Sequence, residues 1–188
     1  MRSKKSTSRG VTLIEVMITV VIIGVLATVA VVAYRSKVTS AKVTEATQMI
    51  QNIRAAQDNY KAETGRYADV SASSTSFYPA TTPGKFTTAW GALCGSACNS
   101  GMDWSVLSVQ PTSPLQFGYA TVAGSASQTT ASKGVAFSVN GTAVSLTPLE
   151  GKAWYVVTAR GDTNGNGVFV QLISTSASND VWIDKEGE

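Results

Sequence analysis

Residues 9–35 read RGVTLIEVMITVVIIGVLATVAVVAYR, and this stretch decides how the rest of the chain is interpreted. Residues 16–34 carry no charge, and only Thr19, Gly24 and Thr28 interrupt the large apolar side chains. As a helix that rises ~1.5 Å per residue, this run is about 28 Å long, which is enough to cross the hydrocarbon core of a bilayer. We therefore expect a membrane-spanning helix.

The excess basic residues of the chain all lie ahead of this apolar run. Four of the 15 Lys and Arg residues fall within the first nine positions, namely Arg2, Lys4, Lys5 and Arg9. The rest of the chain contains 11 basic and 12 acidic residues. Because basic flanks stay in the cytoplasm, the chain beyond Arg35 should lie on the outer side of the membrane.

Glu15 is a carboxylate near the start of the apolar stretch. At bilayer depth it costs roughly 2.5–3.5 kcal/mol unless it finds a partner or reaches the interface, and a plain membrane anchor has no use for it.

A basic head and an apolar run also describe a signal peptide or signal anchor. A cleaved signal peptide ends in small residues followed by a turn, whereas residues 35–64 contain neither proline nor glycine. The sequence favours a helix that continues past the membrane.

Composition excludes several classes of protein. The 188 residues are enough for one modest domain plus an appendage. With His 0 and Cys 2, histidine triads and structural zinc sites are excluded. The 44% hydrophobic and 14% charged content argues against disorder and against a specific nucleic-acid site. Because no serine or acid lies in a nucleophile-elbow, phosphate-loop or metalloprotease motif, we expect no enzymatic activity.

An amphipathic helix follows the apolar run. Apolar residues recur at intervals of largely three or four positions, which predicts one buried face: Val38, Ala41, Ala46, Met49, Ile53, Ala56 and Tyr60. Gly65 is a typical helix stop. The sequence predicts one helix over residues 11–64, about 80 Å long.

The C-terminal part of the chain is typical of antiparallel β structure. Five runs favour strands: 117–122, 135–139, 142–146, 153–158 and 168–173. Asn140-Gly141 between the second and third predicts a two-residue hairpin, which also explains the glycosylation sequon that starts at Asn140. We therefore predict an α+β fold in which the amphipathic half of one long helix packs against a C-terminal antiparallel sheet. The four tryptophans are expected in packing rather than in a ligand platform: Trp90, Trp104, Trp154 and Trp182.

Two further motifs could bind a metal or change redox state. Cys94 and Cys98 are expected to form a disulfide that closes a small loop, since the spacing of redox and zinc motifs is missing. Asp162, Asn164 and Asn166 match the first half of a calcium loop. Its second half fails, because Ile173 stands where the bidentate glutamate belongs. A tight turn is therefore the favoured interpretation, calcium is a weak alternative, and no other cofactor or metal is expected.

The octapeptide RGVTLIEV at residues 9–16 resembles the processing site of type IV prepilins. Members of that family have a short basic leader ending in glycine, a hydrophobic first mature residue, a Thr-Leu-x-Glu motif and a long apolar helix. The resemblance implies cleavage between Gly10 and Val11 by a membrane prepilin peptidase and N-methylation of Val11, where valine replaces the usual phenylalanine. It also implies that Glu15 neutralises the N-terminal amine of a neighbouring subunit during assembly.

The resemblance implies five segments: a removed leader (1–10), a transmembrane and filament-core helix (11–35), an amphipathic helix (36–65), a loop region (66–104) and a β-sheet head (105–188). The implied function is that of a type IV pilus subunit for adhesion, motility or DNA uptake. The implied partners are copies of the same chain, the peptidase, an assembly platform and an ATPase. The precursor would lie in the bacterial inner membrane and the product on the cell surface. A minor pilin, a type II secretion pseudopilin and a non-polymerising membrane-anchored binding domain remain alternatives.

Overall fold

The computed structural model describes residues 10–91 and 94–186, so most of the expected leader lies outside the described residues. The chain divides into two compact units, Met1–Val38 and Thr39–Glu188. It contains one long helix followed by an antiparallel sheet, and the predicted α+β fold is confirmed.

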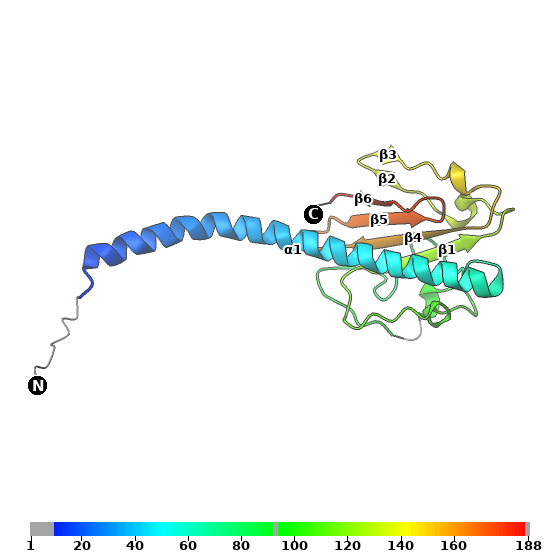
Figure 1. Cartoon of the computed structure of the whole chain (residues 1–188), viewed down its shortest axis with the longest axis horizontal. Helices are drawn as coiled ribbons and strands as arrows, with labels where there is room; N and C mark the ends of the chain where they lie inside the picture. The colour runs from blue at the N-terminus through cyan, green and yellow to red at the C-terminus, as the bar shows by residue number, and fades with distance from the viewer. Residues whose placement is uncertain (1–9, 92–93, 187–188) are drawn as a thin grey trace, which may run out of the picture. The chain divides into compact units, whose positions relative to one another are not determined.

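Helix α1 spans Leu13–Thr64 and contributes to both units (Figure 1). It ends where the sequence predicts, because Gly65 adopts a left-handed conformation with a φ of 78°. The Gly65 N–H donates to the Lys61 carbonyl at 2.8 Å, which satisfies one of the last helical carbonyls. In the part of the chain that the structure describes, four short 3-10 helices follow at Gly95–Ala97, Trp104–Leu107, Thr130–Lys133 and Thr147–Leu149.

The main sheet has four strands in the order β1-β4-β5-β6, and each neighbouring pair is antiparallel. Its strands are β1 (Gly118–Gly124), β4 (Trp154–Gly161), β5 (Val170–Thr175) and β6 (Val181–Asp184). A separate hairpin is formed by β2 (Ser138–Val139) and β3 (Thr142–Ala143), with Val139 paired to Thr142. Its two-residue turn at Asn140-Gly141 is the one predicted.

The sheet is covered on both faces, so its strands alternate between two cores. Figure 1 shows the part of α1 that belongs to the second unit lying across one face. There Ile50 and Ile53 of α1 share a core with Tyr155 and Leu172 of the sheet. On the opposite face Trp154 packs in a second core with these residues: Val122, Val135, Leu149, Val156 and Ile173. Burial on both faces explains why the strands are almost continuously apolar.

Two buried polar side chains join α1 to the sheet. Gln57 has an exposed fraction of 0%, donates to the Ala68 carbonyl at 2.7 Å and to Thr121 Oγ1 at 2.9 Å, and accepts the Ala68 N–H at 2.9 Å. Arg54 donates to Ser174 Oγ at 2.8 Å and to Asn179 Oδ1 at 2.7 Å. Hydrogen bonding makes the burial of these polar groups tolerable.

Several details differ from the sequence predictions. The buried helix face is shifted, because Val43, Ile50, Arg54 and Gln57 are buried whereas Ala41 is exposed. The runs predicted at 135–139 and 142–146 pair over only two residues each. Strand β6 was not predicted. The connection between β4 and β5 is longer than a tight turn, since Gly161 pairs with Val170 and residues 162–169 lie between them.

Candidate processing and assembly site

The bond between Gly10 and Val11 lies in irregular, exposed backbone. Neither residue is helical, α1 begins only at Leu13, and the side chain of Val11 is 70% exposed. Helical backbone hides its carbonyl and N–H groups in internal hydrogen bonds, whereas irregular backbone leaves them open to a peptidase. The structure therefore places the expected cleavage site immediately before the ordered helix.

Thr12 caps the start of α1. Its Oγ1 accepts the backbone N–H of Glu15 at 3.3 Å, and its carbonyl accepts the N–H of Val16 at 3.3 Å. A threonine followed three residues later by glutamate is the spacing of a capping box. This role of Thr12 was not predicted, although the Thr-x-x-Glu spacing carried the signal. The same four residues thus define both the prepilin-like motif and the helix start.

Glu15 is exposed in the first turn of α1. The N-terminus of a helix carries a partial positive charge, so a carboxylate in the first turn is favourable there. Cleavage at Gly10 would create a largely protonated α-amine at Val11, beside the same positive helix end. That arrangement requires a nearby negative charge, and Glu15 is the acidic residue of the first turn.

The apolar part of α1 has no cover in the first unit. Every residue from 10 to 37 is exposed, and among the described residues α1 is the helix long and apolar enough to span a membrane. Its two threonine hydroxyls donate within the helix, from Thr19 to the Val16 carbonyl at 2.8 Å and from Thr28 to the Val25 carbonyl at 2.7 Å. Internal satisfaction of polar groups is what an apolar environment demands.

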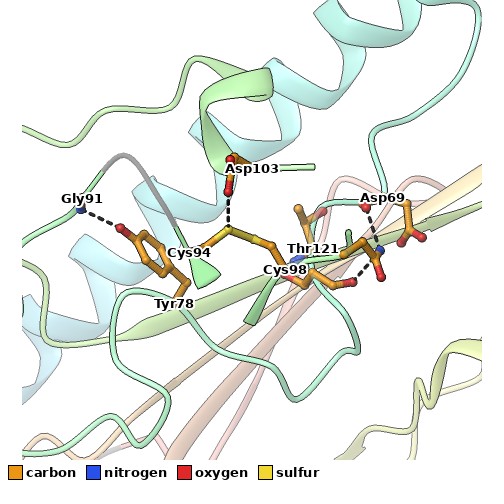
Figure 2. Close-up of a disulfide and its surroundings, with 9 residues drawn as sticks. Asp69, Tyr78, Gly91, Cys94, Cys98, Asp103 and Thr121 are labelled. Carbon is orange, nitrogen blue, oxygen red and sulfur yellow. Dashed lines mark hydrogen bonds between the residues drawn. A yellow bond between two sulfur atoms is a disulfide. The ribbon is translucent and has the colours of Figure 1, made fainter. Parts of the chain in front are cut away.

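Cys94 and Cys98 are joined in a disulfide, drawn in Figure 2. Both cysteines are buried, and the loop is also held by backbone bonds, since the Asn99 N–H donates to the Val70 carbonyl at 2.8 Å. Asp103 Oδ1 lies 3.2 Å from the Cys94 sulfur. These three residues have the spacing of a metal cluster, but the two sulfurs are bonded to each other and present no thiolates. The disulfide is therefore a local structural cross-link within one loop.

The carboxylate of Asp162 closes its own loop. Oδ1 accepts the Gly165 N–H at 2.6 Å, and Oδ2 accepts the Gly167 N–H at 3.0 Å. Burial raises the pKa of Asp162, but hydrogen bonds from the backbone N–H groups of residues 164–167 outweigh this and hold it below its ordinary value. Lys42 donates to the Thr163 carbonyl at 2.8 Å and fixes the loop on α1.

A groove of about 500 Å³ lies between α1 and residues 106–111 in the second unit. Its lining side chains are mostly apolar groups or amides, and its ionisable groups are Glu63 and the hydroxyl of Tyr60. A single carboxylate beside a tyrosine is a poor acid–base pair. The groove does not alter the expectation of a non-enzymatic protein.

The chain is similar to known proteins in its N-terminal segment. Residues 5–31 match the family model described as the prokaryotic N-terminal methylation motif. No curated protein and no solved structure matches the chain. The match ends before the head, so it concerns the leader junction, the cap at Thr12 and the apolar helix. Residues 5–31 therefore carry a type IV prepilin-like methylation motif at the start of a long apolar helix.

Proposed function

We propose that the chain is a filament subunit: an inner-membrane precursor that is cleaved after Gly10, methylated at Val11 and polymerised through the apolar part of α1 into a type IV pilus on the cell surface. The observation that carries this proposal is the coincidence of the methylation motif at residues 5–31 with a helix whose apolar part is exposed throughout. A prepilin-like motif implies a prepilin peptidase, and the platform protein and ATPase of assembly follow from the same resemblance.

The exposed apolar part of α1 supports polymerisation because it needs an apolar environment at every stage. Moving one Leu, Ile or Val side chain out of water contributes about 1.5–3 kcal/mol. A bilayer supplies that environment before assembly, and the packed helices of neighbouring subunits supply it in a filament. Transfer between the two therefore leaves the apolar side chains covered throughout.

The charges at the start of the mature chain support a specific order of packing. The new amine at Val11 and the carboxylate of Glu15 are opposite charges, and in a water-poor core leaving either unpaired costs several kcal/mol. Pairing the amine of one subunit with Glu15 of another removes both costs at once. This pairing also offsets the repulsion between the amine and the positive helix end.

The decisive measurement is the intact mass of this chain in filaments sheared from cells. A mass that begins at Val11 and carries one added methyl group would show cleavage, methylation and incorporation together. A high abundance would support a major pilin, and a trace amount would support the minor-pilin alternative. Full-length chain in the membrane, with none in the sheared fraction, would contradict the proposal and favour the anchored binding domain.

A Glu15→Ala variant tests the charge pairing. The variant is expected to be inserted and cleaved normally, since the residues at the cleavage site are unchanged, but to reach the sheared fraction poorly. Glu45→Ala is the matched control, because Glu45 is an exposed glutamate of the same helix beyond the apolar part. Normal filament yield from Glu15→Ala would refute this role, whereas low yield from both variants would point to a general defect of the helix.

A further inference from the structure

The chain contains three Asn-Gly pairs outside its main sheet, at Asn140-Gly141, Asn164-Gly165 and Asn166-Gly167. All three asparagines are exposed. Asn-Gly is the pair in which the backbone nitrogen after the asparagine reaches the side-chain amide most easily, because glycine has no Cβ to obstruct it. From sequence alone the three pairs are equivalent.

Hydrogen bonding distinguishes them. The N–H groups of Gly165 and Gly167 both donate to the carboxylate of Asp162, at 2.6 Å and 3.0 Å. By contrast, Gly141 lies in the turn between paired Val139 and Thr142, and its N–H has no acceptor within the described residues. The backbone nitrogen that could attack the asparagine side chain is therefore hydrogen-bonded at Gly165 and Gly167, whereas at Gly141 it is available.

The side-chain amides of the same asparagines differ in a second way. Asn164 Oδ1 accepts the N–H of Asn166 at 2.9 Å, and Asn166 Oδ1 accepts the N–H of Val168 at 2.7 Å. These bonds aim each side chain at the residue two positions ahead and away from the adjacent glycine nitrogen. Asn140 is held by its backbone instead, since its N–H donates to Asp184 Oδ1 at 2.8 Å.

We infer that Asn140 is a site of spontaneous deamidation, and that the carboxylate of Asp162 protects Asn164 and Asn166 from the same reaction. In this reaction the Gly141 nitrogen gives its proton to solvent base and bonds to Cγ of Asn140. The bond from Cγ to Nδ2 breaks, and ammonia leaves with a proton from solvent. Water then opens the cyclic imide at either carbonyl, which yields aspartate or isoaspartate. The reaction needs no reagent except water.

Protection by Asp162 has a direct electrostatic reason. Removing the proton from Gly165 or Gly167 would create a negative charge in contact with a carboxylate, and it would break a charge-assisted hydrogen bond. The strength of such bonds corresponds to a slowing on the order of ten- to a hundredfold. No carboxylate accepts from Gly141 among the described residues, since Asp184 accepts from the preceding N–H.

Deamidation would change the surface of the head. It places a carboxylate beside Asp184, whose own carboxylate holds the hairpin of β2 and β3 at Asn140. The new carboxylate and the carboxylate of Asp184 carry like charges and repel each other. Isoaspartate also adds a carbon to the main chain of the two-residue turn, which fixes the register of the hairpin. The hairpin tip therefore becomes more acidic and less well held with age.

The test is peptide mapping by mass spectrometry of the full chain, kept in detergent at mildly alkaline pH in ¹⁸O-labelled water. The peptide with Asn140 is expected to gain the mass of an oxygen-labelled acid first, with an isoaspartate component, and the peptides with Asn164 and Asn166 on the order of ten- to a hundredfold more slowly. Asn59, which is exposed but precedes tyrosine, is the internal control and should stay unchanged. Equal or faster reaction at residues 164 and 166 would overturn the inference, as would a glycan found on Asn140.

Matched variants test the protection separately. Asp162→Asn keeps the shape of the side chain but removes its charge, and it should raise deamidation at Asn164 and Asn166 on the order of tenfold while leaving Asn140 unchanged. Asp184→Asn removes a carboxylate near the other hairpin and should leave Asn164 and Asn166 as they are. If Asp162→Asn has no effect at either asparagine, the assigned role of the carboxylate is wrong.

Discussion

At the scale of single residues, Gln57 illustrates how α1 is fixed to the rest of the second unit. Its amide satisfies both backbone groups of Ala68 and also reaches Thr121. We predict that Gln57→Ala lowers the free energy of unfolding by about 2–5 kcal/mol, because it leaves buried polar groups unpaired and opens a cavity. The measurement is urea denaturation of the full chain in detergent, followed by tryptophan fluorescence.

Gln51→Ala is the matched control, since Gln51 is an exposed glutamine of the same helix and should change stability by about 0.5 kcal/mol at most. Similar denaturation midpoints for the two variants would contradict the role assigned to Gln57.

The burial of Gln57 and Arg54 could not be predicted from the helical pattern, which places polar residues toward solvent. Their partners lie far away in sequence, at Ala68 and Ser174, and only the fold brings them together.

At the scale of elements, the hydrogen bonding of the loop at 162–167 is that of a structural turn rather than that of a calcium site. The carboxylate oxygens of Asp162 accept N–H donors, and the ammonium of Lys42 holds the carbonyl of Thr163. A calcium ion would have to displace these donors, and two of its expected ligands are uncharged amides. We therefore predict that millimolar calcium leaves the Tm of the full chain in detergent unchanged.

Acid is expected to affect this loop where calcium does not. Because the pKa of Asp162 is lowered in the folded chain, its stabilising contribution is present above about pH 4 and is lost as the pH falls through the folded value. Asp162→Asn should remove this part of the acid dependence. A calcium-induced rise in Tm that Asp162→Asn abolishes would instead establish a calcium site.

How much of the fold could be predicted varies from element to element. The end of α1 and the strands β1, β4 and β5 follow from local patterns, namely the stop at Gly65 and the apolar runs, whereas α1 begins at Leu13 rather than at the predicted residue 11. Strand β6 was missed because its apolar run is only Val181, Trp182 and Ile183 before the polar residues Asp184 and Lys185, which is too short to stand out. The hairpin was overestimated because Phe137 and Leu146 pack against the second core and leave only two pairs in register.

At the scale of the whole molecule, removal of the proposed leader would change the charge that accompanies the apolar helix. The full chain has a net charge of +3, whereas residues 11–188 contain 11 basic and 12 acidic groups. In the membrane, leader charges at the cytoplasmic surface are favourable, by about 1 kcal/mol each where the lipids are anionic. In a filament core the same charges would be buried, which costs several kcal/mol per ion. In the proposed function, cleavage would therefore decide whether the membrane or the filament core is the more favourable environment for the helix.

We predict that in cells lacking the prepilin peptidase the chain accumulates in the membrane with its mass starting at Met1, and that the sheared fraction contains none of it. The comparison is with the same chain in cells that have the peptidase, measured by intact mass in both fractions. Because insertion depends on the apolar run and the basic flank, the total amount in the membrane should not fall. Filaments that contain the uncleaved chain would show that four leader charges per subunit can be accommodated, and the electrostatic account of processing would then be wrong.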